Sequence, residues 1–121
     1  MNGKIMAERE IRQGDVFWYD FGPARGSAPA DRRPCVIVQN DTYNRSLIGR
    51  TLVCAITSNL ARANDPGNVM LEVGEAGLPE ASVVNITLIM TVYKAQLLER
   101  IGRVNPATMQ EIRAGIHLLI D

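Results

Sequence analysis

The stretch Arg33-Pro-Cys-Val-Ile-Val-Gln-Asn40 places a run of apolar, mostly β-branched residues between a proline and a polar turn. Such a run favours a strand. A residue before proline is biased toward an extended backbone, so Arg33 is expected at the start of that strand. A second stretch, Val53-Cys-Ala-Ile-Thr-Ser-Asn59, has the same form, with Thr57 at the end of its strand. The two stretches predict two buried strands whose ends are polar.

Alternation of apolar and polar residues predicts six short strands along the chain. Their expected ranges are Asp15 to Phe21, Cys35 to Gln39, Leu52 to Thr57, Val69 to Val73, Val83 to Val92 and Leu98 to Val104. Clusters of Gly, Pro, Asn and Asp between these ranges predict turns. Many short strands at regular intervals are typical of a small antiparallel barrel or sandwich, so the predicted fold class is mainly β with some α.

One helix is predicted near the C-terminus. Asn105 can cap its first turn, and Pro106 suits the first helical position. Apolar residues then recur at helical spacing, at Met109, Ile112, Ile116, Leu119 and Ile120. Gly115 weakens this helix by up to about 1 kcal/mol relative to alanine, unless close packing requires a small residue there. The helix should pack on the barrel, and a shorter helical turn is expected between Asn40 and Arg45.

The composition is that of an ordinary globular protein. The chain has 121 residues, of which 46% are hydrophobic and 21% are charged, which suits one packed core. We expect a single domain over residues 1–121 with a loose N-terminal tail over residues 1–11. The longest apolar runs are far shorter than the roughly 20 residues that a membrane helix needs, and no secretory signal is visible. We therefore expect a cytoplasmic protein without membrane association.

The charge is unevenly distributed along the chain. Residues 1–62 hold nine basic and six acidic residues, a net charge of +3, whereas residues 63–121 hold four and seven, a net charge of −3. The positive excess is greatest between residues 25 and 50, where five arginines face two aspartates. Such clustering can mark a surface that binds phosphate groups. The alternative is a solvated loop of mixed charge.

The residue inventory excludes several kinds of catalytic site. The only histidine, His117, lies in the predicted C-terminal helix, so one chain cannot supply a pair of histidines. Cys35 and Cys54 lie inside apolar strands, where we expect them to be buried, and they cannot complete a zinc site with one histidine. Arginine, hydroxyl and amide groups at strand ends remain, and these suit the binding of phosphate. If the two strand ends adjoin, Arg33 and Thr57 can share one phosphate.

The order of short motifs along the chain resembles a known family. The motifs are Gln13-Gly-Asp-Val16, Arg33-Pro34 leading into Val36-Ile-Val-Gln-Asn-Asp41, Thr57-Ser58, Gly77-Leu-Pro79, Ser82-Val-Val-Asn85 and Lys94 to Gly102. In order and spacing they resemble the MazF/PemK family of toxin endoribonucleases, from about Gln13 to the C-terminus. The resemblance implies an SH3-like antiparallel β-barrel of the CcdB/MazF type, with a C-terminal helix, that forms a homodimer.

The resemblance also implies a reaction. Family members cut single-stranded RNA, which is mRNA and in some cases rRNA or tRNA, at short sequence motifs without a metal ion or another cofactor. The ribose 2′-OH attacks the adjacent phosphate and leaves a 2′,3′-cyclic phosphate and a 5′-hydroxyl. The family's catalytic arginine falls on Arg33 and its partner threonine on Thr57. Arg33 would stabilise the pentacoordinate charge, and Thr57 would donate a hydrogen bond to the phosphate.

Further residues are predicted to contact RNA. They are Arg25, Gly26, Ser27, Arg32, Asn40, Ser58, Asn59 and Asn85, and for the asparagines a turn or capping role is equally expected. Trp18 and Tyr19 alternate across one strand, so one should pack while the other can stack on a base. Ala28-Pro29 stands where many family members have Glu-Gln. This change removes a carboxylate that can orient RNA or act as a base, and we expect an altered base preference.

The resemblance implies a partner and leaves two alternatives. The partner is a MazE-like antitoxin whose flexible segment occupies the RNA groove and folds on binding, in a complex that binds DNA. One alternative is a gyrase poison like CcdB, which ends in Trp-Gly-Ile, whereas this chain ends in Leu118-Leu-Ile-Asp121. The other is a barrel without catalytic activity that binds RNA or a partner, in which Arg33 is structural.

Overall fold

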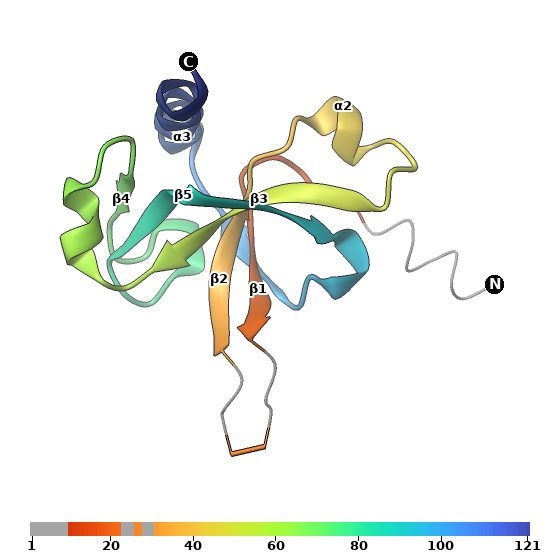
Figure 1. Ribbon diagram of the computed structural model, residues 1–121, viewed down its shortest axis with the longest axis horizontal. Helices are drawn as coiled ribbons and strands as arrows, with labels where there is room; N and C mark the ends of the chain where they lie inside the picture. Colours follow the sequence, from red (N-terminus) through yellow and green to blue (C-terminus); the bar gives the residue numbers. More distant parts are fainter. Residues whose placement is uncertain (1–9, 23–25, 28–30) are drawn as a thin grey trace.

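The protein is built on one curled, six-stranded antiparallel sheet with a helix packed across β4 and β5 (Figure 1). The computed structural model describes residues 10–22, 26–27 and 31–121. The strands follow the order β4-β5-β3-β2-β1-β6 across the sheet. Their bounds are β1 Asp15–Gly22, β2 Asp31–Ile37, β3 Arg50–Thr57, β4 Val69–Leu71, β5 Ser82–Tyr93 and β6 Arg100–Arg103. The helices are α2 Asp41–Asn44 and α3 Pro106–Ile120, with 3-10 turns at η1 Leu60–Asn64, η2 Glu75–Gly77 and η3 Lys94–Gln96.

These elements confirm the predicted fold class, mainly β with a C-terminal helix. All six predicted strands and both helical segments are present, with shifted bounds. The largest shift is in β2, which begins at Asp31 rather than Cys35 and so contains Pro34. Pro34 pairs with Trp18 of β1. The backbone N–H of Trp18 points away from β2 and donates to Glu99 O at 2.9 Å. The missing N–H of Pro34 therefore leaves no bond to β1 unmade, and on the side of β3 the ladder ends at Cys35, so the strand tolerates the proline.

The sheet carries an apolar core on each of its faces. Val36, Cys54 and Ile112 belong to the cluster beneath α3, whereas Cys35 belongs to the cluster on the other face, with Phe17. Both thiols are buried, as predicted, and burial raises the pKa of each to about 12. Because the two cysteines lie on opposite faces of neighbouring strands, they serve as small apolar residues rather than as a disulfide.

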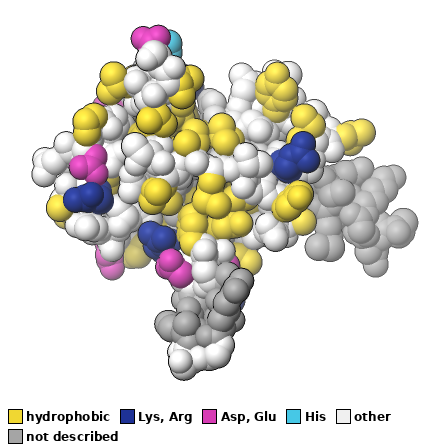
Figure 2. Space-filling model, in the orientation of Figure 1, with side chains coloured by type: hydrophobic (Ala, Val, Ile, Leu, Met, Phe, Trp, Pro, Cys, Tyr) yellow, Lys and Arg dark blue, Asp and Glu magenta, His cyan; other side chains and the backbone are white. Residues whose placement is uncertain are grey.

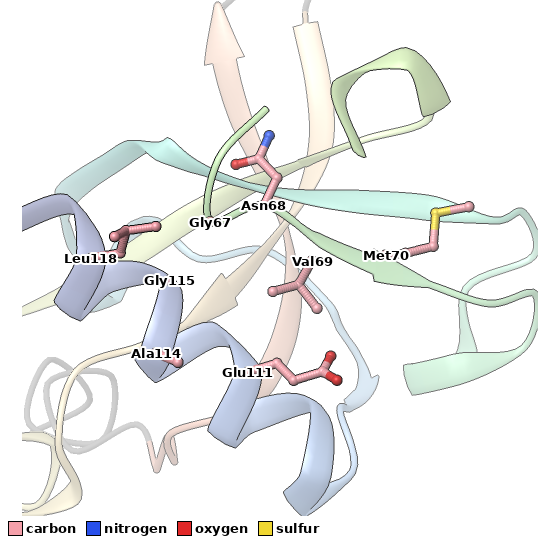
Figure 3. A pocket seen from close by; sticks show the side chains of 8 residues that line it. All are labelled: Gly67, Asn68, Val69, Met70, Glu111, Ala114, Gly115 and Leu118. Atoms are coloured by element: carbon pink, nitrogen blue, oxygen red, sulfur yellow. The ribbon is translucent and has the colours of Figure 1, made fainter. Parts of the chain in front are cut away.

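The C-terminal helix forms as the sequence predicts. The Asn105 side chain caps it by accepting the N–H of Thr108 at 2.9 Å, and Pro106 occupies the first turn. Gly115 meets Gly67, in the turn before β4, so closely that a Cβ on either glycine would press on the backbone of the other (Figure 3). The helix thus contains glycine because close packing requires it. No described helix combines the length and the apolar character that a bilayer crossing needs.

The edges of the sheet are joined by a 3-10 turn rather than by strand pairing. β4 and β6 lie at opposite ends of the strand order, and η2, which follows β4, packs against β6. A Cβ on Gly102 of β6 would collide with the backbone of Ala76 in η2, so this contact also depends on glycine. At the N-terminal side Ile11, which the sequence placed in the tail, is 2% exposed and packs with Phe17.

Candidate active site

A cleft of about 240 Å³ lies where β2 and β3 separate. Arg32, Arg33, Thr57 and Ser58, four of the residues predicted to handle RNA, all line it. The other walls are formed by Trp18, Pro34, Ile56, Leu78, Pro79, Glu80 and Ser82. The structure thus brings the predicted catalytic arginine and threonine to one hollow, as the strand-end argument requires.

Strand register explains why these two side chains meet. β2 and β3 pair at Cys35 with Ala55 and at Ile37 with Val53. The same register carried two positions further puts Arg33 opposite Thr57, but the ladder stops at Cys35. Beyond that point no further residues of the two strands pair, and the cleft lies between them.

Thr57 is held firmly on the β3 side of the cleft. Its backbone pairs with Val83 of β5, and its hydroxyl oxygen accepts the N–H of Asn59 at 3.1 Å. Because the hydroxyl accepts in that bond, its own proton can be directed at an anion in the cleft. The neighbouring residue Asn59 has a capping role, since its side-chain oxygen accepts the N–H of Ala61 at the start of η1 at 3.2 Å.

The Arg33 guanidinium is oriented by two contacts. It lies over the Phe21 ring, with Cζ 5.0 Å from the ring centroid, and its Nη2 donates to Asp31 Oδ2 at 3.2 Å. Its Nε lies 3.2 Å from Asp31 Oδ1 but is not aligned with it, so this buried donor makes no hydrogen bond. The guanidinium plane is thus fixed by Phe21 and Asp31, and a phosphate that binds this edge with two hydrogen bonds takes the place of Asp31.

An apolar hollow adjoins Arg33 on its other side. About 380 Å³ in volume, it is lined by Phe21, Asp31, Arg33, Ala55 and the β5 residues Thr87 to Met90. Figure 2 shows apolar side chains gathered in the middle of this face, above the strands β1 and β2. Leu88 and Met90 are 46% and 36% exposed, so the arginine lies between a polar cleft and an apolar surface.

Trp18 is the more exposed of the two aromatic residues that alternate along β1. It is 37% exposed and lines both the cleft and a neighbouring hollow of about 630 Å³, which it shares with Arg32, Leu98 and Glu99. Tyr19 instead packs edge-on against Phe21, with ring centroids 5.0 Å apart. Of the two alternating aromatic residues, Tyr19 is therefore the one that packs and Trp18 is the one with the exposed ring.

Asn40 is placed far from the cleft. Its side chain caps α2 by accepting the N–H of Thr42 at 2.6 Å. Arg33 lies near the start of β2 and Asn40 lies beyond its end, so the two residues are about 20 Å apart along an extended chain. The next residue, Asp41, accepts the N–H of Gln13 at 2.7 Å.

The pKa of the Asp41 carboxyl lies below its ordinary value. Burial alone would raise this pKa, but the hydrogen bonds from Gln13 and Asn44 and the nearby guanidinium groups lower it by more.

The remaining predicted contacts are not gathered at the cleft. The Asn85 oxygen on β5 accepts hydrogen bonds from Asn68 and Thr87, at 3.4 Å and 3.2 Å. Gly26 and Ser27 form an exposed turn, and Arg25 lies outside the described residues. The sequence reasoning missed Glu80, which lines the cleft, although it directly follows the Gly77-Leu-Pro79 motif.

A further hollow, between α3 and the turn before β4, is less suited to RNA than the cleft. Its volume is about 460 Å³, and Figure 3 shows its lining residues. Glu111 is the charged side chain among the described residues that line it. A carboxylate repels phosphate, so the cleft that holds Arg32 and Arg33 is the better site for a polyanion.

Comparison with known proteins identifies the family of this chain. Residues 12–120 match the family described as PemK-like, MazF-like toxin of type II toxin-antitoxin system. The chain is 41% identical over 111 residues to Endoribonuclease MazF6 of Mycobacterium tuberculosis, which covers 92% of this chain and 97% of the relative. It is 33% identical over 108 residues to Endoribonuclease MazF of Staphylococcus saprophyticus, which covers 89% of each chain.

Solved structures show the same fold. An endoribonuclease in complex with its cognate antitoxin, from a mycobacterial species, superposes with a TM-score of 0.73 at 26% identity, covering 92% of this chain and 97% of that one. MazF from Deinococcus radiodurans superposes with a TM-score of 0.71 at 22% identity, covering 93% and 97%. Family match, sequence identity and fold agree over nearly the whole length, and this chain belongs to the PemK-like, MazF-like toxins of type II toxin-antitoxin systems.

Proposed function

We propose that this chain is the endoribonuclease toxin of a type II toxin-antitoxin system and cleaves single-stranded RNA without a metal ion. The ribose 2′-OH attacks the adjacent phosphate, so that the products carry a 2′,3′-cyclic phosphate and a 5′-hydroxyl. The observation that carries the proposal is that Arg33 and Thr57 line one cleft between strands that have stopped pairing. The RNA substrate, mRNA or in some cases rRNA or tRNA, is met in the cytoplasm.

Arg33 and Thr57 act on the charge that develops at phosphorus. As the O2′–P bond forms, the non-bridging oxygens gain negative charge, and N–H and O–H donors already in place stabilise that charge. Arg33 is not the base in this scheme, because a guanidinium keeps its proton at any physiological pH. Its fixed plane over Phe21 instead suits it to bind two phosphate oxygens in the place that Asp31 occupies.

The surroundings of the cleft suit a single strand of RNA. Trp18 offers an exposed ring on which a base can stack, and Arg32 on the same wall can neutralise a flanking phosphate. The apolar hollow beside Phe21 and Met90 offers room for a base on the other side of Arg33. Bases splayed to both sides of the scissile phosphate would give a short sequence preference.

Asp31 competes with RNA for the guanidinium. Replacing Asp31 by asparagine removes the negative charge that holds Arg33, and we expect RNA to bind about two- to fivefold more tightly. The effect is small because both side chains are partly exposed, 38% and 51%, and such ion pairs contribute at most about 1 kcal/mol. Fluorescence anisotropy with an RNA that has 2′-deoxyribose at the cut site measures the affinity without cleavage. Weaker binding by Asp31→Asn would mean that Asp31 orients Arg33 instead of competing for it.

Partners are proposed from the family relation. One mycobacterial neighbour is described as an endoribonuclease in complex with its cognate antitoxin, and Deinococcus radiodurans structures are described as MazE-MazF. We infer that this chain forms a homodimer and binds a MazE-like antitoxin, in a complex that binds DNA. An antitoxin segment that enters the cleft would inhibit by occupying the place of the phosphate.

The proposed reaction is tested by incubating the purified protein with a mixed-sequence RNA in excess EDTA. We expect cleavage to persist and the 5′ fragments to end in a cyclic phosphate, which mass spectrometry identifies. Intact RNA together with inhibited gyrase would support the CcdB-like alternative. RNA that is bound but intact would support a barrel without catalytic activity. Cleavage that stops in EDTA and resumes with added metal would contradict the metal-independent mechanism.

A further inference from the structure

Glu80 lines the same cleft as Arg33 and Thr57. It lies in the connection between η2 and β5, where its backbone oxygen accepts the Ser82 hydroxyl at 3.0 Å, and its side chain is exposed. In the sheet β3 lies between β5 and β2. The cleft therefore has an acidic wall from the start of β5 and a basic wall from β2, with Thr57 between them.

The proposed reaction needs a group that accepts the proton of the 2′-OH. Neither Arg33 nor Thr57 can do so near neutral pH, since one is a permanent cation and the other a hydroxyl. The single imidazole is also excluded by position, because His117 lies at the end of α3, is 76% exposed, and has Asp121 3.8 Å from its Nε2. The two thiols are buried, and burial raises their pKa to about 12.

Other carboxylates near the site are less well placed. Asp31 is paired with Arg33 and lines the apolar hollow, and Glu99 lines the hollow beyond Trp18. The internal residues outside the described part, 23–25 and 28–30, contain no acid and no histidine in the sequence. Among the residues that line the cleft itself, Glu80 is the acidic one, and the charged side chains that share the cleft with it are Arg32 and Arg33.

We propose that Glu80 is the general base of this toxin, a role that rests on the function proposed above. The Glu80 carboxylate takes the proton from the 2′-OH as the O2′–P bond forms. The P–O5′ bond then breaks on the side of Arg33, whose N–H groups stabilise the departing oxygen, and that oxygen takes a proton from water.

The test compares Glu80→Gln with Glu72→Gln, a matched change at an exposed glutamate outside the cleft. Single-turnover cleavage of one RNA oligonucleotide is followed from about pH 3.5 to about pH 9, a range that includes the ordinary titration of a glutamate. We expect Glu80→Gln to lower the rate constant about a hundredfold, to leave RNA affinity nearly unchanged, and to abolish the acidic limb of the pH profile. Glu72→Gln should behave as the wild type. Because Glu80 is exposed, both variants should melt at the wild-type temperature.

Each outcome decides for or against the proposal. A wild-type rate in Glu80→Gln would overturn it, and so would a loss confined to RNA affinity with the acidic limb intact, which would make Glu80 a binding residue. If Arg33→Ala is inactive while Glu80→Gln is fully active, the proposed function stands and the assignment of the base is wrong. If the wild-type protein leaves RNA intact, both proposals are wrong together.

Discussion

Replacing Arg33 by alanine is expected to lower the rate of RNA cleavage about a thousandfold while the protein stays folded. The loss follows from removing the donors that stabilise the charge on the phosphate, an effect worth about 3 to 4 kcal/mol in comparable sites. The fold should survive, because the ion pair with Asp31 is partly exposed and contributes at most about 1 kcal/mol. Single-turnover kinetics measure the rate, and circular dichroism with thermal melting measures the fold.

Two further variants make the result specific to this guanidinium. Arg62 lies in η1, outside the cleft, and pairs with Asp65. Replacing it by alanine should leave the cleavage rate unchanged. Arg33→Lys keeps the charge but loses the planar pair of donors, so it should recover only part of the rate. Thr57→Ala should also be folded and should fail to arrest growth when expressed. Normal cleavage by folded Arg33→Ala protein would refute the proposed mechanism.

The strands and the C-terminal helix could be predicted because their signals are local. Alternation of side chains locates β1, β3 and β5 to within a few residues, and Asn105 with Pro106 marks the start of α3. The predicted start of β2 was four residues too late, because a proline usually marks the end of a strand rather than its interior. Its position opposite Trp18, where no N–H is needed, depends on a partner strand that the sequence does not identify.

The site was predictable only as far as it depends on strand ends. Arg33 lies near the start of β2 and Thr57 at the end of β3, so antiparallel pairing brings them together whatever the details of the loops. Asn40 lies beyond the other end of β2, where it has the capping role in α2 that was one of its two expected roles. Glu80 escaped notice because it reaches the cleft through η2 and the Pro79 turn, whose path is set by contacts with β6 rather than by a local pattern.

Contacts between residues far apart in the sequence also decide the effect of Gly115→Ala, the substitution for which we expect the largest loss of stability. In an isolated helix this change would stabilise by about 1 kcal/mol. Here the new Cβ would collide with the carbonyl oxygen of Gly67 and press on Ile86. Gly67 cannot easily move, because its φ of +82° ties it to a conformation that other residues rarely adopt. Overpacking typically costs about 1 to 3 kcal/mol and more against backbone, so it outweighs the gain in helix propensity.

We expect Gly115→Ala to lower the free energy of unfolding by about 2 kcal/mol or more, and the melting temperature by about 5 to 10 °C. Gly49→Ala is the matched control, because no atom lies within 4 Å of its new Cβ. That change should be neutral or should stabilise by a few tenths of a kcal/mol, through the entropy of the unfolded chain. Differential scanning calorimetry and urea titration measure both variants. A Gly115→Ala protein as stable as Gly49→Ala would show that α3 can move away from the turn before β4, and that the close approach of the two glycines is not required for the fold.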